Sequence, residues 1–361
     1  MSSPEIRVGL VGPLPPPSGG MAMQTLQLAR LLGDEGIRVE LVQTNPPYRP
    51  RAIAHLRGLR ALFRLVPYLW RVWTLAGRSD VIHVMANSGW AWQLFAAPVV
   101  WAGWFRRTPV IVNYRGGEAR QYLTRSIRWI RPTLSKATRL VVPSGYLEAV
   151  FREFSVGSAV IPNIVDLELF RPAMERLGTE AFTLVVARNL EPIYGIDNAL
   201  RAFSLARQMR CDLQLKIAGS GPQLETLQCL ANELGIADAV TFLGRLDREG
   251  IVTLYHSADA MLNPSRVDNM PNSILEALAS GLPVISTHVG GVPYMVQDAE
   301  TALLVPADDP QAMASAILRL ADDAELRGRL RSRGIEEVAQ YSWAEVRPLW
   351  LGLYQQLVDA V

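Results

Sequence analysis

Each half of this chain opens with a strand, a glycine-containing loop and a helix, and few architectures accept that order twice. In the first half, the apolar run Ile6–Val11 predicts a buried strand, and a helix is expected over Met21–Leu32. In the second half, Phe182–Ala187 predicts a strand and Ile196–Arg207 the following helix. Parallel strands require such crossovers, because a tight hairpin cannot join them. The pattern predicts parallel α/β sheets.

The length favours two domains rather than one, because 361 residues exceed an ordinary single domain. A turn-rich stretch near residues 162–172 is typical of a boundary. We therefore expect an N-terminal domain over residues 1–170 and a C-terminal domain over 171–340. Residues 341–361 are expected to form a helix that packs back toward the N-terminal domain. The predicted fold class is α/β, with two doubly wound Rossmann-like domains facing a cleft.

The composition and the spacing of Cys and His argue against a secreted protein, a disulfide-bonded protein and a metalloprotein. The first residues lack a basic region followed by an apolar stretch, so no signal peptide is expected and the cytoplasm is the expected location. Cys211 and Cys229 show no metal-ligand spacing and are expected to be reduced core residues. The four histidines are scattered along the sequence, so we expect no metal site.

Charge is distributed unevenly. Residues 1–180 carry 22 Lys and Arg against 12 Asp and Glu, whereas the remainder carries 14 against 22. Basic and aromatic side chains recur together in residues 49–78 and 101–131, and the first of these segments has no acid. This combination suits an anionic membrane surface. The alternative is a solvated helix face. Nucleic acid is not expected, because the aromatic residues are spaced for packing or for an interface rather than for base stacking.

The segment Pro264–Ser286 contains two acids seven residues apart, with a helix start between them. Ser273 and Glu276 match a capping box, which predicts that a helix begins at about Ser273. Asp268 lies on the preceding loop. A helix N-terminus attracts anions, and a nearby carboxylate accepts hydrogen bonds from sugar hydroxyls, so the segment suits a nucleotide sugar. The alternative is that Glu276 only caps the helix and Asp268 only forms a turn.

Glycines precede two further predicted helices. Gly19 and Gly20 stand before the first helix of the chain, and Gly219 and Gly221 stand before a helix of the second half. Glycine allows a backbone to approach a phosphate or a sugar closely. A plain strand-to-helix turn that needs small residues explains the same pattern.

In order and spacing, these motifs resemble the retaining glycosyltransferases of family 4, which have the two-domain GT-B fold. The matching residues are Gly19-Gly20, Pro162-Asn-Ile-Val-Asp166, Arg188, Ala218-Gly-Ser-Gly-Pro222, Phe242-Leu-Gly244, the segment Pro264–Ser286 and Gly290-Gly291. The resemblance implies a nucleotide-sugar donor held mainly by the C-terminal domain and an acceptor held mainly by the N-terminal domain.

The resemblance also implies roles for individual residues. Arg188, Asp268 and Glu276 are the predicted catalytic residues: Glu276 binds the ribose hydroxyls, Asp268 lies near the donor sugar and Arg188 pairs with the diphosphate. The predicted donor-binding residues are Gly19, Gly20, Gly219, Gly221, Arg245, Asn269, Met270, Pro271, Asn272 and Ser273. Arg115 and Gly116 are acceptor-side candidates. The implied reaction needs no metal and no cofactor beyond the nucleotide sugar itself.

The sequence departs from the family pattern at three places. Asp268 stands where the first acid is usually Glu. Tyr194 precedes Gly195, where the family usually has a lysine, so a second cation is missing or is supplied by Arg245 or Arg266. Arg115 lies in the region that usually carries a His-Gly pair.

The resulting prediction is a glycosyltransferase of polysaccharide or glycoconjugate synthesis. It would move a sugar from a nucleotide-diphosphate donor to a glycan or lipid-linked acceptor, with retention, at the cytoplasmic face of a membrane. One alternative is a degenerate nucleotide-sugar-binding scaffold, which the three departures motivate. Another is a nucleotide-sugar epimerase of the same fold.

Overall fold

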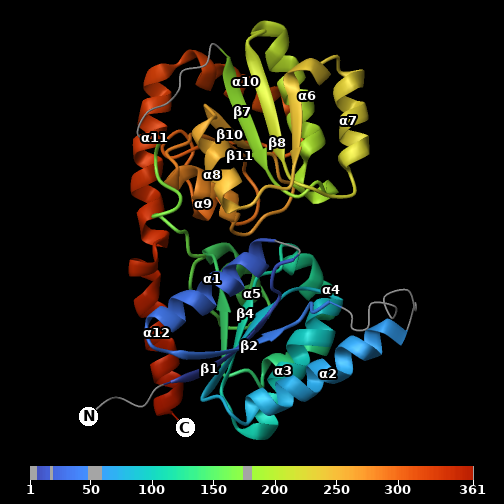
Figure 1. The fold of residues 1–361 in the computed structure, drawn as a ribbon, viewed down its shortest axis with the longest axis vertical. Coiled ribbons are helices and arrows are strands. Elements are labelled where there is room, and N and C mark those ends of the chain that lie inside the picture. The colour runs from blue at the N-terminus through green and yellow to red at the C-terminus, as the bar shows by residue number, and fades with distance from the viewer. Residues whose placement is uncertain (1–5, 17–18, 48–58, 174–180, 361) are drawn as a thin grey trace. The chain divides into compact units, whose positions relative to one another are not determined.

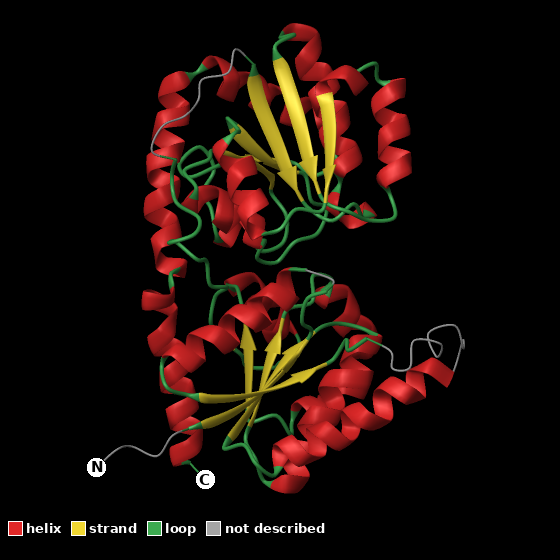
Figure 2. Ribbon diagram, in the orientation of Figure 1, coloured by secondary structure: helices red, strands yellow, loops and turns green. Residues whose placement is uncertain are grey.

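A computed structural model describes residues 6–16, 19–47, 59–173 and 181–360, and its contacts divide the chain into two units. The first unit extends to Ile164 and resumes at Val346, and the second extends from Val165 to Glu345. Each unit contains a six-stranded sheet flanked by helices (Figure 1 and Figure 2). The predicted fold class of two doubly wound α/β domains is confirmed. The expected boundary at residue 170 falls a few residues after the observed division.

The first sheet has the strand order β2-β1-β3-β4-β5-β6, and all neighbouring strands are parallel. Its strands are β1 (Arg7–Gly12), β2 (Arg38–Gln43), β3 (Val81–Ala86), β4 (Val110–Tyr114), β5 (Arg139–Val142) and β6 (Ala159–Val160). Its helices are α1 (Gly20–Asp34), α2 (Leu59–Ala76), α3 (Ala97–Arg106), α4 (Ala119–Leu134) and α5 (Gly145–Glu153), with a π-helical turn, η2 (Trp92–Ala96), before α3. Because strands are added on opposite sides of β1, the loops after β1 and β3 lie at a topological switch point.

The second sheet has the order β12-β11-β10-β7-β8-β9, again with every pair parallel. Its strands are β7 (Phe182–Ala187), β8 (Leu213–Ala218), β9 (Val240–Gly244), β10 (Ala260–Asn263), β11 (Val284–Thr287) and β12 (Leu303–Val305). Its helices are α6 (Ile196–Met209), α7 (Leu224–Glu233), α8 (Arg248–His256), α9 (Asn272–Ala279), α10 (Pro310–Asp322) and α11 (Ala324–Val338). Here the switch point lies between β7 and β10.

Apolar runs become central strands in both units, because helices cover both faces of each sheet. All six residues of β3 are buried, and so are all four of β10. The two cysteines do not follow the sequence expectation: Cys211 and Cys229 are unpaired and exposed. Cys211 opens a turn before β8, and Cys229 faces outward on α7.

The last helix, α12 (Trp343–Asp359), contributes to the first unit from Val346 onward. Its Trp350 ring lies 4.6 Å from the ring of His83 on β3, and the hydroxyl of Tyr354 lies 2.7 Å from His83 Nδ1. All three side chains are buried. The aromatic residues of the final helix therefore complete the core of the first unit.

Candidate functional site

The switch point of the second sheet brings together residues that are far apart in the sequence. Arg188 follows β7 directly, and Asp268 lies on the loop after β10. Because β7 and β10 are parallel neighbours, their carboxyl ends meet at one edge of the sheet. Ligands of doubly wound sheets bind in this position. The two predicted catalytic residues therefore lie where a ligand of this fold is expected.

Arg188 is held on several sides. It forms an ion pair with Asp268, and each of the two side chains is 11% exposed. Its Nη2 also donates to Ser265 Oγ at 3.1 Å. The ring of Tyr194 lies beneath it, with 4.2 Å from Arg188 Cζ to the ring centroid. Its Nε is buried and has no hydrogen-bond partner among the described residues. The guanidinium is thus fixed but retains one unused donor.

Asp268 has a buried carboxylate. Its Oδ1 accepts a hydrogen bond from the backbone N–H of Asn269 at 3.1 Å. Burial raises the pKa of Asp268, and the Arg188 guanidinium opposes that shift. The carbonyl of Asp268 accepts from the N–H of Gly291 at 3.0 Å. A Cβ at Gly291 would lie 1.8 Å from the Asn269 carbonyl oxygen, so this glycine permits the close approach that fixes the loop.

The predicted helix start at about Ser273 is confirmed to within one residue, but the predicted capping box is wrong. Helix α9 begins at Asn272, and its N-cap residue, Pro271, makes no side-chain cap hydrogen bond. Ser273 lies inside the first turn, where its buried Oγ has no hydrogen-bond partner among the described atoms. The alternative in which Glu276 only caps the helix therefore fails. Asn269, Met270 and Pro271 are buried next to this helix start, and their contact with a donor stays a prediction.

Glu276 lies one turn into α9 and is partly buried. Burial raises the pKa of Glu276 to about 7, against the lowering effects of Arg248, Tyr255 and Arg188. Arg248 is itself paired with Asp166, at 3.1 Å from Nη2 to Oδ2. A carboxyl group with a pKa near neutrality, in a polar cluster at a switch point, is typical of a binding or catalytic site.

Gly219 and Gly221 have a packing role at this edge. A Cβ at Gly219 would lie 1.8 Å from the Arg188 carbonyl oxygen, and one at Gly221 would lie 2.4 Å from the Leu190 carbonyl oxygen. These glycines bring the loop after β8 against the backbone of Arg188. Their own contact with a ligand stays a prediction.

Arg245 and Arg266 are the two candidates for a second cation, and the Arg266 guanidinium is already paired with other residues. Its guanidinium pairs with Asp197 and Asp308, each at 2.7 Å. Its Nη1 also donates to the Pro192 carbonyl at 2.6 Å. Arg245 follows β9 and is exposed. Arg266, on the loop after β10, thus braces the loop before α6, and the donor-binding role of Arg245 stays a prediction.

Arg115 takes part in a buried polar chain of the first unit. Its Nε donates to Asn113 Oδ1 at 3.2 Å, and its Nη1 donates to Asn163 Oδ1. Asn113 Nδ2 lies 3.0 Å from His83 Nε2. Burial lowers the pKa of Arg115 to about 10 and the pKa of His83 to about 3. Gly116 is tightly packed, because a Cβ there would lie 2.4 Å from Ser88 Oγ.

The glycines at the start of α1 behave differently. Gly19 is the N-cap residue in an extended conformation, without a side-chain cap, and Gly20 is the first helical residue. A Cβ at Gly19 would meet no described atom within 4 Å. Packing therefore does not require glycine at position 19. Gly19, Gly20, Arg115 and Gly116 belong to the first unit, whereas the predicted residues from Arg188 onward gather in the second.

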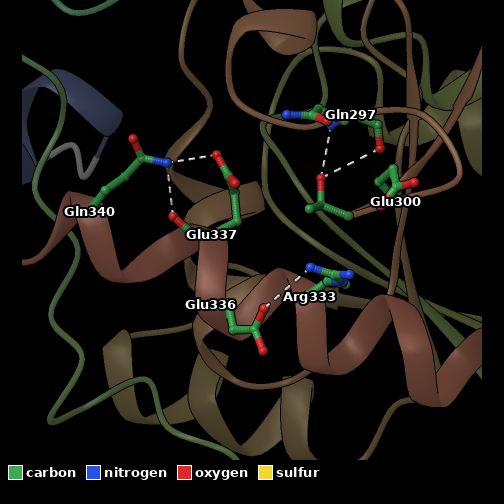
Figure 3. A pocket seen from close by; sticks show the side chains of 7 residues that line it. Gln297, Glu300, Arg333, Glu336, Glu337 and Gln340 are labelled. Atoms are coloured by element: carbon green, nitrogen blue, oxygen red, sulfur yellow. Dashed lines mark hydrogen bonds and ion pairs between the residues drawn. The ribbon is translucent and has the colours of Figure 1, made fainter.

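A separate surface pocket of about 260 Å³ lies along α11 and the loop before β12 (Figure 3). Gln340 Nε2 donates to Glu337 Oε1 at 2.6 Å, and Arg333 lies 3.8 Å from Glu336. None of its lining residues belongs to the cluster at the switch point. Across the described ranges, no group of three or more His, Cys, Asp and Glu residues is arranged to hold a metal ion.

Two sequence models of known families cover adjacent parts of the chain. The one described as Glycosyltransferase Family 4 matches residues 18–169, and the one described as Glycosyl transferases group 1 matches residues 170–337. The chain belongs to glycosyltransferase family 4. The predicted family is confirmed.

Curated relatives of this family 4 protein include enzymes named D-inositol 3-phosphate glycosyltransferase. The one from Saccharomonospora viridis is 38% identical over 213 residues, which cover 54% of this chain and 49% of that enzyme. In such matches the chain spans about half the length of the curated relatives. The enzyme from Stackebrandtia nassauensis is 26% identical, over 95% of this chain and 88% of the relative.

Solved structures share the fold of this family 4 protein along its whole length. The sucrose-phosphate synthase of Thermosynechococcus elongatus superposes with a TM-score of 0.80 at 22% identity, covering 99% of this chain and 100% of that one. HepE of Anabaena, in complex with UDP, has a TM-score of 0.77 at 17% identity, covering 97% and 100%. These similarities confirm the GT-B fold.

Sequence reasoning missed three residues around the family 4 site: Arg248, Tyr255 and Ser265. Ser265 follows a buried strand within two residues, which is a usable signal for a polar residue at a sheet edge. Arg248 and Tyr255 lie on α8 and come close to the site only through the fold. Tyr194, which the sequence marks only as a departure from the family's lysine, ends the turn η3 (Pro192–Tyr194) and contacts Arg188.

Proposed function

We propose that this family 4 protein transfers a sugar from a nucleotide-diphosphate donor to a glycan or lipid-linked acceptor, with retention of anomeric configuration. The observation that carries the proposal is the cluster of Arg188, Asp268, Ser273 and Glu276 at the switch point. Within the described part of the chain, Arg188 Nε and Ser273 Oγ of this cluster have no hydrogen-bond partner. The names of the curated relatives support glycosyl transfer, and the UDP bound to HepE supports a nucleotide donor.

In this proposal, the side chains of the second unit perform most of the chemistry. The Glu276 carboxylate accepts hydrogen bonds from the ribose hydroxyls, and Asp268 contacts the donor sugar. Arg188 pairs with the diphosphate and stabilises the negative charge that develops on the leaving group. Backbone groups of residues 269–272 and the first turn of α9 hold the sugar and the phosphates. Catalysis then depends on placement and charge stabilisation rather than on a covalent nucleophile.

Transfer is tested by incubating the protein with UDP-, GDP- and ADP-sugars and a lipid or glycan extract, with products identified by mass spectrometry. The proposal predicts that the donor is consumed only when acceptor is present and that the product retains the anomeric configuration. Conversion of the donor to an isomer without acceptor would instead indicate an epimerase. Donor binding without turnover in any extract would indicate a scaffold protein.

We also propose that the reaction needs no metal ion, since the diphosphate charge is met by Arg188 and by the N-terminal turn of α9. Activity should then be unchanged after dialysis against EDTA and after addition of Mg²⁺ or Mn²⁺. A loss of turnover in EDTA that one of these ions restores would contradict this part of the proposal.

We further propose that the protein acts at the cytoplasmic face of an anionic membrane, through the ends of α2 and α3. Among the described residues, all five exposed tryptophans lie in the first unit. Arg106 lies over the Trp73 ring at 5.2 Å and Lys136 over the Trp104 ring at 4.5 Å, so cations and aromatic rings alternate on this surface. Phe105, beside them, is 63% exposed. No helix in the described part of the chain is both long and apolar enough to cross a bilayer.

The membrane proposal is tested by sedimentation with vesicles that contain anionic or only zwitterionic lipids. Wild type should bind the anionic vesicles, and binding should weaken as salt rises. Replacing Trp73, Trp104 and Phe105 by Ser should reduce binding at least tenfold. The matched control replaces the exposed residues Met209, Leu243 and Tyr294 of the second unit by Ser. Equal binding by the two triple variants, or no binding by wild type, would contradict the proposal.

A further inference from the structure

The aromatic ring beneath Arg188 belongs to a residue with no role in the proposed chemistry. Tyr194 ends the short turn η3, and its ring centroid lies 4.2 Å from Arg188 Cζ. This distance is within the range of a cation–π interaction, which strengthens as the pair loses contact with water. Tyr194 also packs against the hydrophobic core of the second unit. A plain core role is therefore the alternative to a role in the site.

The turn that carries the ring is fixed from outside. The backbone N–H of Arg266 donates to the Ile193 carbonyl at 2.8 Å, and its guanidinium donates to the Pro192 carbonyl. Gly195 follows with φ of +60°, where a Cβ would lie 2.2 Å from the Pro264 carbonyl oxygen. The turn therefore lies against the loop that carries Asp268, and the backbone of Tyr194 cannot move away from Arg188 without breaking these contacts.

The face and the edges of the Arg188 guanidinium have different neighbours. The Tyr194 ring covers one face of the guanidinium, and Asp268 and Ser265 engage Nη2. The buried Nε has no partner among the described residues, and therefore one edge of the group is unused. Burial raises the pKa of Tyr194, so its hydroxyl stays protonated and the ring stays neutral. A neutral ring orients the cation without neutralising its charge, which stays available to an anionic ligand.

We propose that Tyr194 is a positioning residue, whose ring holds the Arg188 guanidinium in one plane while its partner changes from Asp268 to the diphosphate of a bound nucleotide. This inference rests on the proposed function, since it takes the diphosphate as the ligand of Arg188. In the structure Asp268 pairs with the guanidinium. On binding, the phosphates replace Asp268, and the carboxylate becomes available to the donor sugar. The ring keeps Arg188 in place during this exchange.

The experiment compares Tyr194→Phe, which keeps the ring, with Tyr194→Leu and Tyr194→Met, which remove it. Calorimetric titration measures the Kd of the nucleoside diphosphate that binds wild type, and steady-state assays measure donor KM and kcat. Tyr194→Phe should stay within about twofold of wild type. The two aliphatic variants should lose about tenfold in affinity, because the guanidinium loses its platform. They should also lose kcat, because Arg188 acts most strongly on the leaving group.

A double-mutant cycle separates positioning from core packing. In an Arg188→Ala background, Tyr194→Leu should have no further effect on the Kd, whereas a loss caused by packing would persist. An unchanged Kd in both aliphatic variants, or an equal loss in the Phe variant, would overturn the inference. If wild type binds no nucleoside diphosphate, the proposed function fails. If wild type binds and the aliphatic variants bind equally well, only the role of Tyr194 fails.

Discussion

The two units share one architecture but use the ends of their strands differently. In the first unit, the polar residues near the ends of β3 and β4 form a continuous chain, in which His83, Asn113 and Arg115 contact one another or Asn163 and Tyr354. In the second unit, Arg188 keeps a buried Nε without a hydrogen-bond partner among the described residues. A satisfied chain stabilises a fold, whereas a buried donor without a partner is uncommon in folded proteins and is often explained by a functional role. The comparison leads us to expect a structural role for Arg115, and it agrees with the proposed binding role of Arg188.

The largest expected effect follows from removing the binding cation. Arg188→Ala should lower kcat/KM for the donor by about 10²–10³, because the leaving group loses a charged, preorganised donor. Steady-state assays with the donor measure the loss. The matched control is Arg201→Ala, an exposed arginine on α6, which should leave kcat/KM within about twofold. Similar losses of kcat/KM in both variants would show that Arg188 contributes no more to activity than an exposed arginine of the second unit.

Arg115 should behave as a stability residue instead. Arg115→Met removes the hydrogen bonds that Asn113 Oδ1 and Asn163 Oδ1 accept, so we expect the free energy of unfolding of the first unit to fall by about 2–3 kcal/mol. Urea unfolding followed by tryptophan fluorescence reports this change, because Trp92 and Trp350 are buried in that unit. Arg120→Met, which removes an exposed ion pair with Glu153, should cost less than about 1 kcal/mol. If Arg115→Met has the stability of wild type but a raised KM for the acceptor, the predicted acceptor-side role of Arg115 would be favoured instead.

Glu276 should lower the unfolding free energy at alkaline pH and contribute to nucleotide affinity. The pKa of Glu276 is about 7 in the folded protein, above the ordinary 4.5. As pH rises, the folded state therefore keeps this proton to a higher pH than the unfolded chain does. Stability from this group is therefore present below about pH 4.5 and is lost as pH rises toward 7. Glu276→Gln removes the buried charge and should raise the unfolding free energy at pH 8 by about 2 kcal/mol.

The same Glu276→Gln variant should lose nucleotide affinity, because a neutral amide accepts hydrogen bonds from the ribose less strongly. Thermal denaturation at pH 5 and pH 8 measures the stability gain, and titration with the nucleotide measures the binding loss. Glu225→Gln, at an exposed position on α7, is the control and should change neither. A Glu276→Gln variant that is less stable at pH 8 than wild type would contradict the assigned burial of the charge.

The smallest expected effect has an unusual sign. Asp268→Asn removes the carboxylate that occupies Arg188, so nucleoside diphosphate should bind about fivefold more tightly while sugar transfer falls. Asp238→Asn makes the same change of charge at a surface pair with Arg207 and should leave the affinity unchanged. A weaker Kd in Asp268→Asn would mean that Asp268 supports Arg188 rather than competing with the ligand.

Local patterns were sufficient to predict the strands and most of the family motifs. The apolar run Phe182–Ala187 is β7 with the predicted bounds, and Arg188 lies at its end as the family motif implied. The capping box failed because Ser and Glu three residues apart also occur inside a helix, and here α9 begins before Ser273. Sequence spacing does not distinguish these two cases.

Contacts between distant segments could not be predicted from the sequence. His83 was one of four scattered histidines, yet it packs against Tyr354 of the last helix, 271 residues away. Tyr194 was a departure from a motif, and only the fold places its ring on Arg188. The exposure of Cys211 and Cys229 was also missed, because helix- and strand-like surroundings do not determine which face a residue occupies.

The central claim is that the cluster around Arg188 and Glu276 in the second unit binds a nucleotide. Thermal denaturation of wild type and Glu276→Ala with UDP, GDP or ADP tests it most directly. A ligand at a hundred times its Kd stabilises the folded state by about 2.7 kcal/mol, which is a readable shift in Tm. We predict a shift with one of the three nucleotides in wild type and a much smaller one in Glu276→Ala. Equal shifts in both proteins, or none in wild type, would contradict the account.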